Sequence, residues 1–129
     1  MPTYRKPLKK QAVKRKSKYN VAPKAQRVYK GKVYDSKLEK NYRGKLELLK
    51  KSVKDYNRVV DIQEQVPFEF VINGVKVCTY LLDFKVTYAD GRVDFIDVKG
   101  VITDVYRIKR KLMLACYGIK IKEVTKKDF

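Results

Sequence analysis

The first clear apolar pattern along the chain has the period of an α-helix. Asp35 or Ser36 can cap this helix at its N-terminus, and the pattern should end near residues 55–57. The residues that would face a core lie three or four positions apart: Leu38, Tyr42, Leu46, Leu49 and Val53. The sequence therefore predicts an amphipathic helix ahead of the first strand of the main sheet.

Three segments after this helix have the composition of β-strands. They span residues 63–71, 76–88 and 93–99, and β-branched and aromatic side chains recur in each. Asn73-Gly74 is a strong turn signal between the first two segments, and Pro67 favours an edge strand. These segments predict two successive hairpins.

A second helix and a last strand should complete the fold. Gly100 breaks the strand pattern, Thr103 or Asp104 can begin the helix, and Gly118 can cap its C-terminus. The residues expected to face inward are Val105, Ile108, Leu112 and Ala115. Residues 119–124 then alternate between apolar side chains and lysines, as expected for a strand reached by a helical crossover. The predicted class is α/β, in the order α-β-β-β-α-β, with a mixed sheet flanked by helices.

The turn of the second hairpin fixes how its two strands pair. A three-residue loop usually ends in a left-handed residue, and glycine adopts that conformation without steric cost. Ala89-Asp90-Gly91 fits such a loop, so Tyr88 should pair with Arg92 and the numbers of opposing residues should sum to 180. In that register Asp83 lies directly opposite Asp97.

This register gathers charged groups on one face of the hairpin. Directly opposed residues share a face, and side chains alternate along a strand, so Asp83, Asp97 and Lys99 should converge. A two-residue loop would shift the pairing by one residue and place Asp83 and Asp97 on opposite faces. Asp83 also interrupts the most apolar strand of the chain, where an unpaired carboxylate is costly.

Charge indicates a polyanionic partner. The chain of 129 residues has 32 Lys and Arg against 14 Asp and Glu, a net charge of +18. Residues 1–32 hold twelve basic residues and no acidic residue, and they predict a flexible tail that contacts nucleic acid, for example through Lys14, Arg15 and Lys16. A solvated basic extension is the alternative. Residues 33–129 should form the folded domain.

Several functional classes are excluded or disfavoured. The chain has no histidine, which excludes Ser-His-Asp catalysis and imidazole zinc sites. It has no signal-like apolar segment, no run long enough to span a membrane and no CxxC motif, so we expect a cytoplasmic protein with no membrane partner. Carboxylate oxygens without His or Cys favour Mg²⁺ or Mn²⁺.

Four motifs together resemble the PD-(D/E)XK nucleases, whose core has the same order of elements. The resemblance covers about residues 34–125 and is closest to small phage-encoded endonucleases related to Holliday junction resolvases. The motifs are Tyr34-Asp35-Ser36-Lys37-Leu38-Glu39, Tyr80-Leu81-Leu82-Asp83-Phe84, Asp97-Val98-Lys99-Gly100 and Arg107-Ile108-Lys109-Arg110-Lys111-Leu112. Leu82 stands where the family name has proline, and the second acid is Asp97.

The resemblance implies a restriction-endonuclease-like domain and assigns a role to each candidate residue. The catalytic residues would be Glu39, Asp83, Asp97 and Lys99. Asp83, Asp97, the backbone carbonyl of Val98 and Glu39 would hold Mg²⁺ or Mn²⁺, and Lys99 would orient or deprotonate the attacking water. Basic residues of the second helix would grip flanking phosphates: Arg107, Lys109, Arg110 and Lys111.

The candidate residues could also have purely structural roles. An acid followed two residues later by a lysine also occurs at Asp35-Ser36-Lys37 and Asp83-Phe84-Lys85, so the motif alone is weak. Glu39 lies three residues after Ser36 and could serve only in a capping box. Asp97 and Lys99 could form an ion pair of little energetic value, and the lysines of the second helix could be merely solvated.

The sequence thus predicts a metal-dependent DNA endonuclease. By resemblance, it would act on branched DNA during phage recombination or DNA processing, as a homodimer in the host cytoplasm. One alternative is a noncatalytic basic protein that binds nucleic acid through charge alone. Another is a nuclease subunit of a larger recombination complex.

Overall fold

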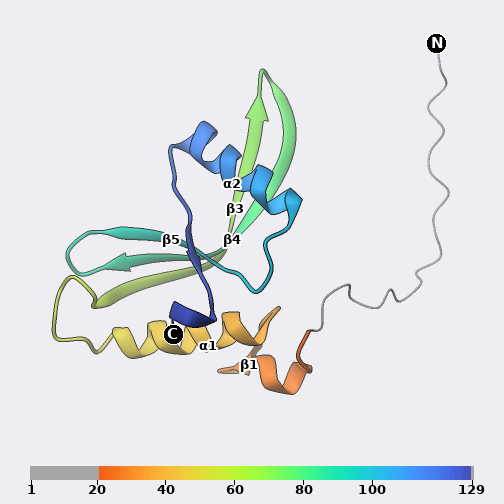
Figure 1. The fold of residues 1–129 in the computed structure, drawn as a ribbon. Helices are drawn as coiled ribbons and strands as arrows, with labels where there is room; N and C mark the ends of the chain where they lie inside the picture. Colours follow the sequence, from red (N-terminus) through yellow and green to blue (C-terminus); the bar gives the residue numbers. More distant parts are fainter. Residues whose placement is uncertain (1–20, 129) are drawn as a thin grey trace, which may run out of the picture.

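Two long strands form the framework on which the other elements pack (Figure 1). The computed structural model describes residues 21–128. Its elements are η1 (Lys24–Arg27), β1 (Val28–Tyr29), β2 (Lys32–Val33), α1 (Lys37–Leu49), β3 (Val59–Ile72), β4 (Val75–Tyr88), β5 (Val93–Val98), α2 (Asp104–Tyr117), β6 (Lys122–Val124) and η2 (Lys126–Asp128).

The main sheet has the strand order β3-β4-β5-β6. The β3–β4 and β4–β5 pairs are antiparallel, whereas β6 pairs in parallel with β5 after the crossover through α2. This confirms the predicted α/β class with a mixed sheet and the order α-β-β-β-α-β. Pro67 lies on β3, an edge strand of this sheet, as predicted.

The β4–β5 hairpin has the predicted register. Phe84 pairs with Ile96 and Thr87 with Val93, so opposing residue numbers sum to 180. The loop closes through the N–H of Tyr88, which donates to the carbonyl of Arg92 at 2.9 Å. Gly91 has a φ of 90°, the left-handed conformation that the turn requires. The next opposed pair in this register is Asp83 and Asp97.

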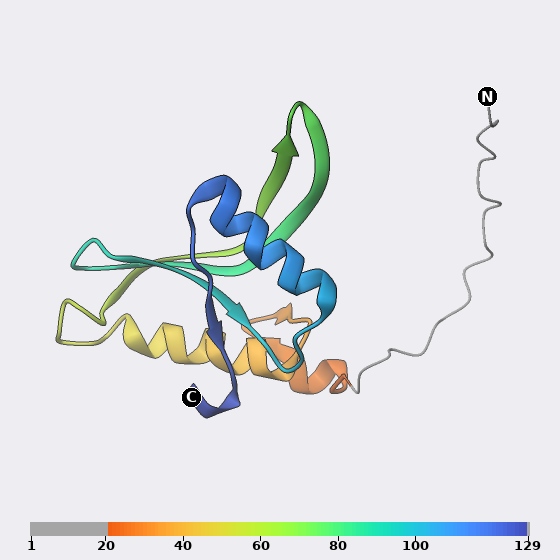
Figure 2. The same cartoon turned by 45° about the horizontal axis from the view of Figure 1, so that its top comes forward.

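Two apolar clusters hold the fold together, one beneath each long helix. The cluster at α1 includes Tyr42, Leu46, Phe84 and Ile96, and the cluster at α2 includes Leu82 and Met113. Figures 1 and 2 show α1 beneath one end of the β3–β4 hairpin and α2 across the other. The second hairpin and its two acids lie where these two regions meet.

Both helices differ from their predicted patterns. The helix α1 begins after Ser36 as expected but ends at Leu49, and Val53 lies beyond it in a turn with 92% of its surface exposed. The prediction that Val53 faces the core is therefore wrong. Lys50, Lys51 and Ser52 instead form successive turns that bond to the last carbonyls of the helix.

The helix α2 packs through a different stripe from the predicted one. Thr103 caps it and Gly118 ends it in a left-handed conformation, both as predicted. Its buried residues are Tyr106 and Met113, whereas Val105, Ile108 and Ala115 are exposed, so the predicted inward face is wrong for these three residues. The buried stripe has the same helical spacing and contains the bulkier aromatic ring, which reaches Glu123 of β6.

The part of the predicted basic tail that the structure describes is structured. Residues 24–33 form η1 and the β1–β2 hairpin, which contact α1. The predicted boundary between residues 32 and 33 falls inside β2, so the folded part begins before residue 33. Lys14, Arg15 and Lys16 lie outside the described residues.

In the part of the chain from 21 to 128, no helix is long and apolar enough to cross a membrane.

Substitution of Leu46 tests the cluster at α1. Leu46→Ala should lower the free energy of unfolding by about 2–5 kcal/mol, because the side chain is fully buried and its removal leaves a cavity. Leu48→Ala, on the exposed side of the same helix, should change it by less than about 0.5 kcal/mol. Urea denaturation followed by circular dichroism measures both, and equal effects would contradict this packing.

Candidate active site

Asp83 and Asp97 are held side by side by β4 and β5. The Oδ2 atom of Asp83 accepts a hydrogen bond from the backbone N–H of Val98 at 2.9 Å. Asp97 is 2% exposed, and its Oδ2 atom accepts a hydrogen bond from the hydroxyl group of Tyr80. The hairpin register thus places two carboxylates of like charge side by side, Asp97 buried and Asp83 half-buried.

Lys99 is the cation that faces this pair. Its Nζ atom lies 2.9 Å from Oδ1 of Asp97 and 3.8 Å from the centroid of the Tyr106 ring. Its backbone N–H donates to the carbonyl of Val124 at 2.8 Å, so β6 fixes the main chain at this point. The predicted convergence of Asp83, Asp97 and Lys99 is therefore present.

A single lysine leaves this pair of carboxylates incompletely compensated. Burial, followed by repulsion from Asp97, raises the pKa of Asp83 to about 7. The Oδ1 atom of Asp97 is buried and accepts no hydrogen bond, although it forms the ion pair with Lys99. The site therefore has the excess negative charge and the vacant oxygen lone pairs that suit a second cation.

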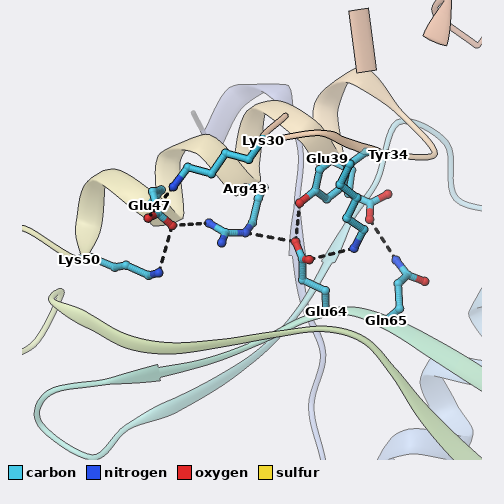
Figure 3. A network of polar contacts seen from close by, with 9 residues as sticks. Lys30, Tyr34, Glu39, Arg43, Glu47, Lys50, Glu64 and Gln65 are labelled. Atoms are coloured by element: carbon cyan, nitrogen blue, oxygen red, sulfur yellow. Dashed lines mark hydrogen bonds and ion pairs between the residues drawn. The ribbon is translucent and has the colours of Figure 1, made fainter. Parts of the chain in front are cut away.

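Glu39 lies in the first turn of α1 and is 5% exposed. The Oγ atom of Ser36 accepts a hydrogen bond from the backbone N–H of Glu39 at 3.0 Å, which confirms Ser36 as the cap. The Glu39 carboxylate instead accepts a hydrogen bond from Nε2 of Gln65 at 3.0 Å (Figure 3). Burial, then repulsion from Asp83 and Asp35, raises the pKa of Glu39 to about 8. Glu39 thus adds charge to the neighbourhood of Asp83.

Gln65 lies on β3, opposite Asp83 in the β3–β4 register. The flanking pairs are Glu64 with Phe84 and Val66 with Leu82. Its φ of 50° is left-handed, which is uncommon for a residue other than glycine. Figure 3 shows Gln65 and the preceding Glu64 both directed towards α1.

A surface pocket of about 310 Å³ opens beside the acids. Asp83, Asp97, Lys99, Tyr106 and Lys109 are among the residues that line it. A larger cavity, of about 550 Å³, lies elsewhere along α2 and contains neither aspartate. The smaller pocket is the one that brings solvent to the charged groups.

The four basic residues of α2 that were predicted to contact phosphates do not lie in one place. Lys109 lines the pocket of the acids, whereas Arg110 and Lys111 line the larger cavity. Arg107 pairs with Asp104 at 3.0 Å, and Arg110 pairs with Glu123. Within residues 21–128, neither Lys109 nor Lys111 has an ion-pair partner. Lys109 is therefore the best placed of the four to meet a substrate.

The family model described as "Protein of unknown function (DUF1064)" matches residues 16–127. The chain belongs to the DUF1064 family. Neither the curated proteins nor the solved structures give a match to it. The chemistry of this DUF1064 protein is therefore argued from its own residues.

Some, but not all, of the carboxylates predicted to bind a hard divalent cation are placed to do so in this DUF1064 protein. The chain between residues 21 and 128 contains no group of three or more acidic or cysteine side chains that could hold a metal ion. The three predicted acids thus do not form one ligand cluster. The carboxylates of Asp83 and Asp97 remain, and Mg²⁺ commonly binds to one or two carboxylates and completes its shell with water. The buried Oδ1 of Asp97, which contacts Lys99 but accepts no hydrogen bond of good geometry, supports this fit.

Sequence analysis missed three side chains that shape the site. Tyr80 bonds to Asp97, Tyr106 stacks against Lys99, and Gln65 bonds to Glu39. Tyr80 begins the motif that contains Asp83, and Tyr106 lies in the first turn of the helix that follows Lys99, so their position in or near the motifs was a usable signal. Gln65 had no such signal, because a left-handed residue inside a strand cannot be read from the sequence.

The raised pKa values of Asp83 and Glu39 predict how stability depends on pH without metal. Between pH 5 and 8 the folded protein binds more protons than the unfolded chain, so the free energy of unfolding should fall as pH rises. We expect a change on the order of 5–7 kcal/mol across this range, measured by urea denaturation in EDTA. Histidine is absent from the chain and adds no titration of its own.

Matched variants assign this pH dependence to the two acids. Asp83→Asn and Glu39→Gln should each reduce the slope, because an amide does not titrate, and the double variant should be nearly flat. Asp61→Asn, an exposed change on β3, should keep the slope of the wild type. A slope that persists in the double variant would contradict the assignment.

Proposed function

We propose that this protein is a Mg²⁺- or Mn²⁺-dependent endonuclease that hydrolyses phosphodiester bonds in DNA. The observation that carries the proposal is the pairing of half-buried Asp83 with buried Asp97, faced by Lys99 at the wall of an open pocket. Placing two carboxylates of like charge together away from bulk water carries a desolvation cost, which a bound cation would offset. A phosphodiester in water needs positive charge and an oriented nucleophile, and this pocket can supply both.

The residues divide the chemistry between them. Asp83 and Asp97 would hold the metal ion, with the carbonyl of Val98 as a further ligand. The bound ion would lower the pKa of a water molecule and offset the charge of the phosphate. Lys99 would orient that water and stabilise the negative charge that develops on the phosphate oxygens. In the hydrolysis, the water oxygen would bond to phosphorus as the bond from phosphorus to the leaving sugar oxygen breaks. The proton lost by the water would pass to solvent, and the leaving oxygen would take up a proton from solvent.

Features of the substrate and assembly form part of the proposal. Lys109 lines the pocket and would contact a phosphate next to the scissile bond. The resemblance of the four sequence motifs to the PD-(D/E)XK nucleases supports branched DNA as substrate, a homodimer as the active form and the cytoplasm of a phage host as its location. The net charge of +18 supports DNA as the partner.

The same charge favours a second candidate, a noncatalytic nucleic-acid-binding protein. In that case the protein binds a synthetic four-way junction but cuts neither it nor a supercoiled plasmid in Mg²⁺ or Mn²⁺. Activity that appears only with a partner protein would indicate a nuclease subunit of a recombination complex. The net charge alone does not account for two carboxylates, half-buried Asp83 and buried Asp97, placed side by side.

Substitution of Asp97 separates cutting from binding. Asp97→Asn should lower the rate of junction or plasmid cleavage by at least about 100-fold, because a neutral amide cannot replace a charged ligand. DNA affinity should stay within about threefold of the wild type. Asp104→Asn, an exposed change in the first turn of α2, is the control and should cut normally. Equal cleavage by both variants would refute the assignment of Asp97.

Substitution of Lys109 tests the proposed phosphate contact. Lys109→Ala should weaken junction binding and reduce the slope of log K against log salt concentration by about 1, since one phosphate contact is lost. Lys51→Ala, which removes an exposed lysine after the end of α1, should leave the slope unchanged. Fluorescence anisotropy across a range of salt concentrations measures both slopes, and an unchanged slope for Lys109→Ala would exclude it from the DNA contact.

A further inference from the structure

Gln65 has a backbone conformation that its surroundings must stabilise. In a regular strand, successive side chains point to opposite faces. Here Glu64 contacts Arg43 of α1 at 3.2 Å, and the next residue, Gln65, contacts Glu39 of the same helix at 3.0 Å. The left-handed φ of 50° at Gln65 accompanies this departure from alternation. Such a conformation costs on the order of 1 kcal/mol or more in a residue with a Cβ atom.

The contacts of Glu64 do not need this conformation. Glu64 is bound by Lys32, Tyr34 and Arg43, and these contacts join the β1–β2 region and α1 to β3 (Figure 3). The left-handed residue adds one further contact, the amide of Gln65 on a glutamate that is almost completely buried. Among the residues from 21 to 128, Gln65 is the hydrogen-bond partner of the Glu39 carboxylate.

Gln65 also lies next to Asp83. The two residues occupy opposed positions on β3 and β4, between the pairs Glu64 with Phe84 and Val66 with Leu82. Hydrogen bonding from Gln65 lowers the pKa of Asp83, against the larger effect of burial. A neutral amide is the suitable group at this position, because a charged side chain would either add repulsion or neutralise an acid.

We propose that Gln65 is a positioning residue, whose amide, presented from a left-handed residue of β3, fixes the Glu39 carboxylate so that its charge acts on a divalent cation bound by Asp83 and Asp97 without coordinating it. The inference rests on the proposed function and deepens it. Glu39 and Gln65 line a small pocket separate from that of the two aspartates, so Glu39 would strengthen cation binding through its charge alone. Groups that act on a metal ion from outside its ligand set commonly change metal affinity or activity 10- to 100-fold when they are replaced.

Two substitutions distinguish the effect of the Gln65 side-chain amide from the effect of its left-handed backbone conformation. Gln65→Gly removes the side chain and tolerates a positive φ, and Gln65→Asn keeps an amide that is one methylene shorter, in a residue that also tolerates this conformation. Both variants should therefore fold, and thermal unfolding should show only a small loss for Gln65→Gly, since relief of the left-handed strain offsets the lost hydrogen bond to Glu39. Gln63→Ala is the matched control, since Gln63 is an exposed glutamine two residues earlier on β3.

Binding of Mn²⁺ to the full chain, measured by electron paramagnetic resonance without DNA, is the main readout. We expect Gln65→Gly and Gln65→Asn to bind Mn²⁺ at least about 10-fold more weakly than Gln63→Ala. We also expect Gln65→Gly to have no further effect in a Glu39→Gln background, because Gln65 acts through Glu39. A merely structural role for Gln65 would change the melting temperature and leave Mn²⁺ affinity unaltered.

The outcomes distinguish this inference from the proposed function. Mn²⁺ affinities of the Gln65 variants within about twofold of the control overturn the inference, even when the wild type cuts DNA. Gln65-dependent Mn²⁺ binding in a wild type that cuts no DNA supports the inference and overturns the endonuclease. A wild type that binds no Mn²⁺ overturns both.

Discussion

The pairing of β4 with β5 places two carboxylates, half-buried Asp83 and buried Asp97, directly across from each other beside a surface pocket. Every other feature of the candidate site depends on this placement. A shift of one residue would move one acid to the opposite face and separate Lys99 from the pair. The left-handed Gly91 and the loop closed between Tyr88 and Arg92 prevent that shift. A turn remote from the acids therefore determines whether they can act together.

Placing these acids together is unfavourable for folding, and the surrounding groups offset that cost only in part. The N–H of Val98 bonds to Asp83, and Tyr80 and Lys99 contact Asp97. These contacts leave the pKa of Asp83 near 7, and the hydrogen bond from Gln65 leaves that of buried Glu39 near 8. The apolar clusters beneath α1 and α2 supply the stability that permits this arrangement. A site that is destabilising in isolation but built on a well-packed framework is typical of sites with a function.

The framework and the register could be predicted because they depend on local signals. Asn73-Gly74 and the loop ending in Gly91 fix two hairpins, and Ser36, Thr103 and Gly118 mark helix ends. The face that α2 buries was mispredicted, since two stripes of similar spacing compete and only tertiary packing against β3, β4 and the segment at β6 decides between them. Gln65 was not foreseen, because its conformation arises from tertiary contacts. The role of Glu39 was left open between a cap and a ligand, and the direction of its carboxylate is decided by Gln65.

Crystals of the protein grown with Mn²⁺, examined by anomalous diffraction, would test the central claim most directly. If Asp83 and Asp97 hold the cation, an anomalous peak should contact carboxylate oxygens of both residues. Lys99 should then be displaced from Oδ1 of Asp97 or share that atom with the ion. Manganese bound only elsewhere, with the two aspartates still held by Val98, Tyr80 and Lys99 alone, would contradict the claim.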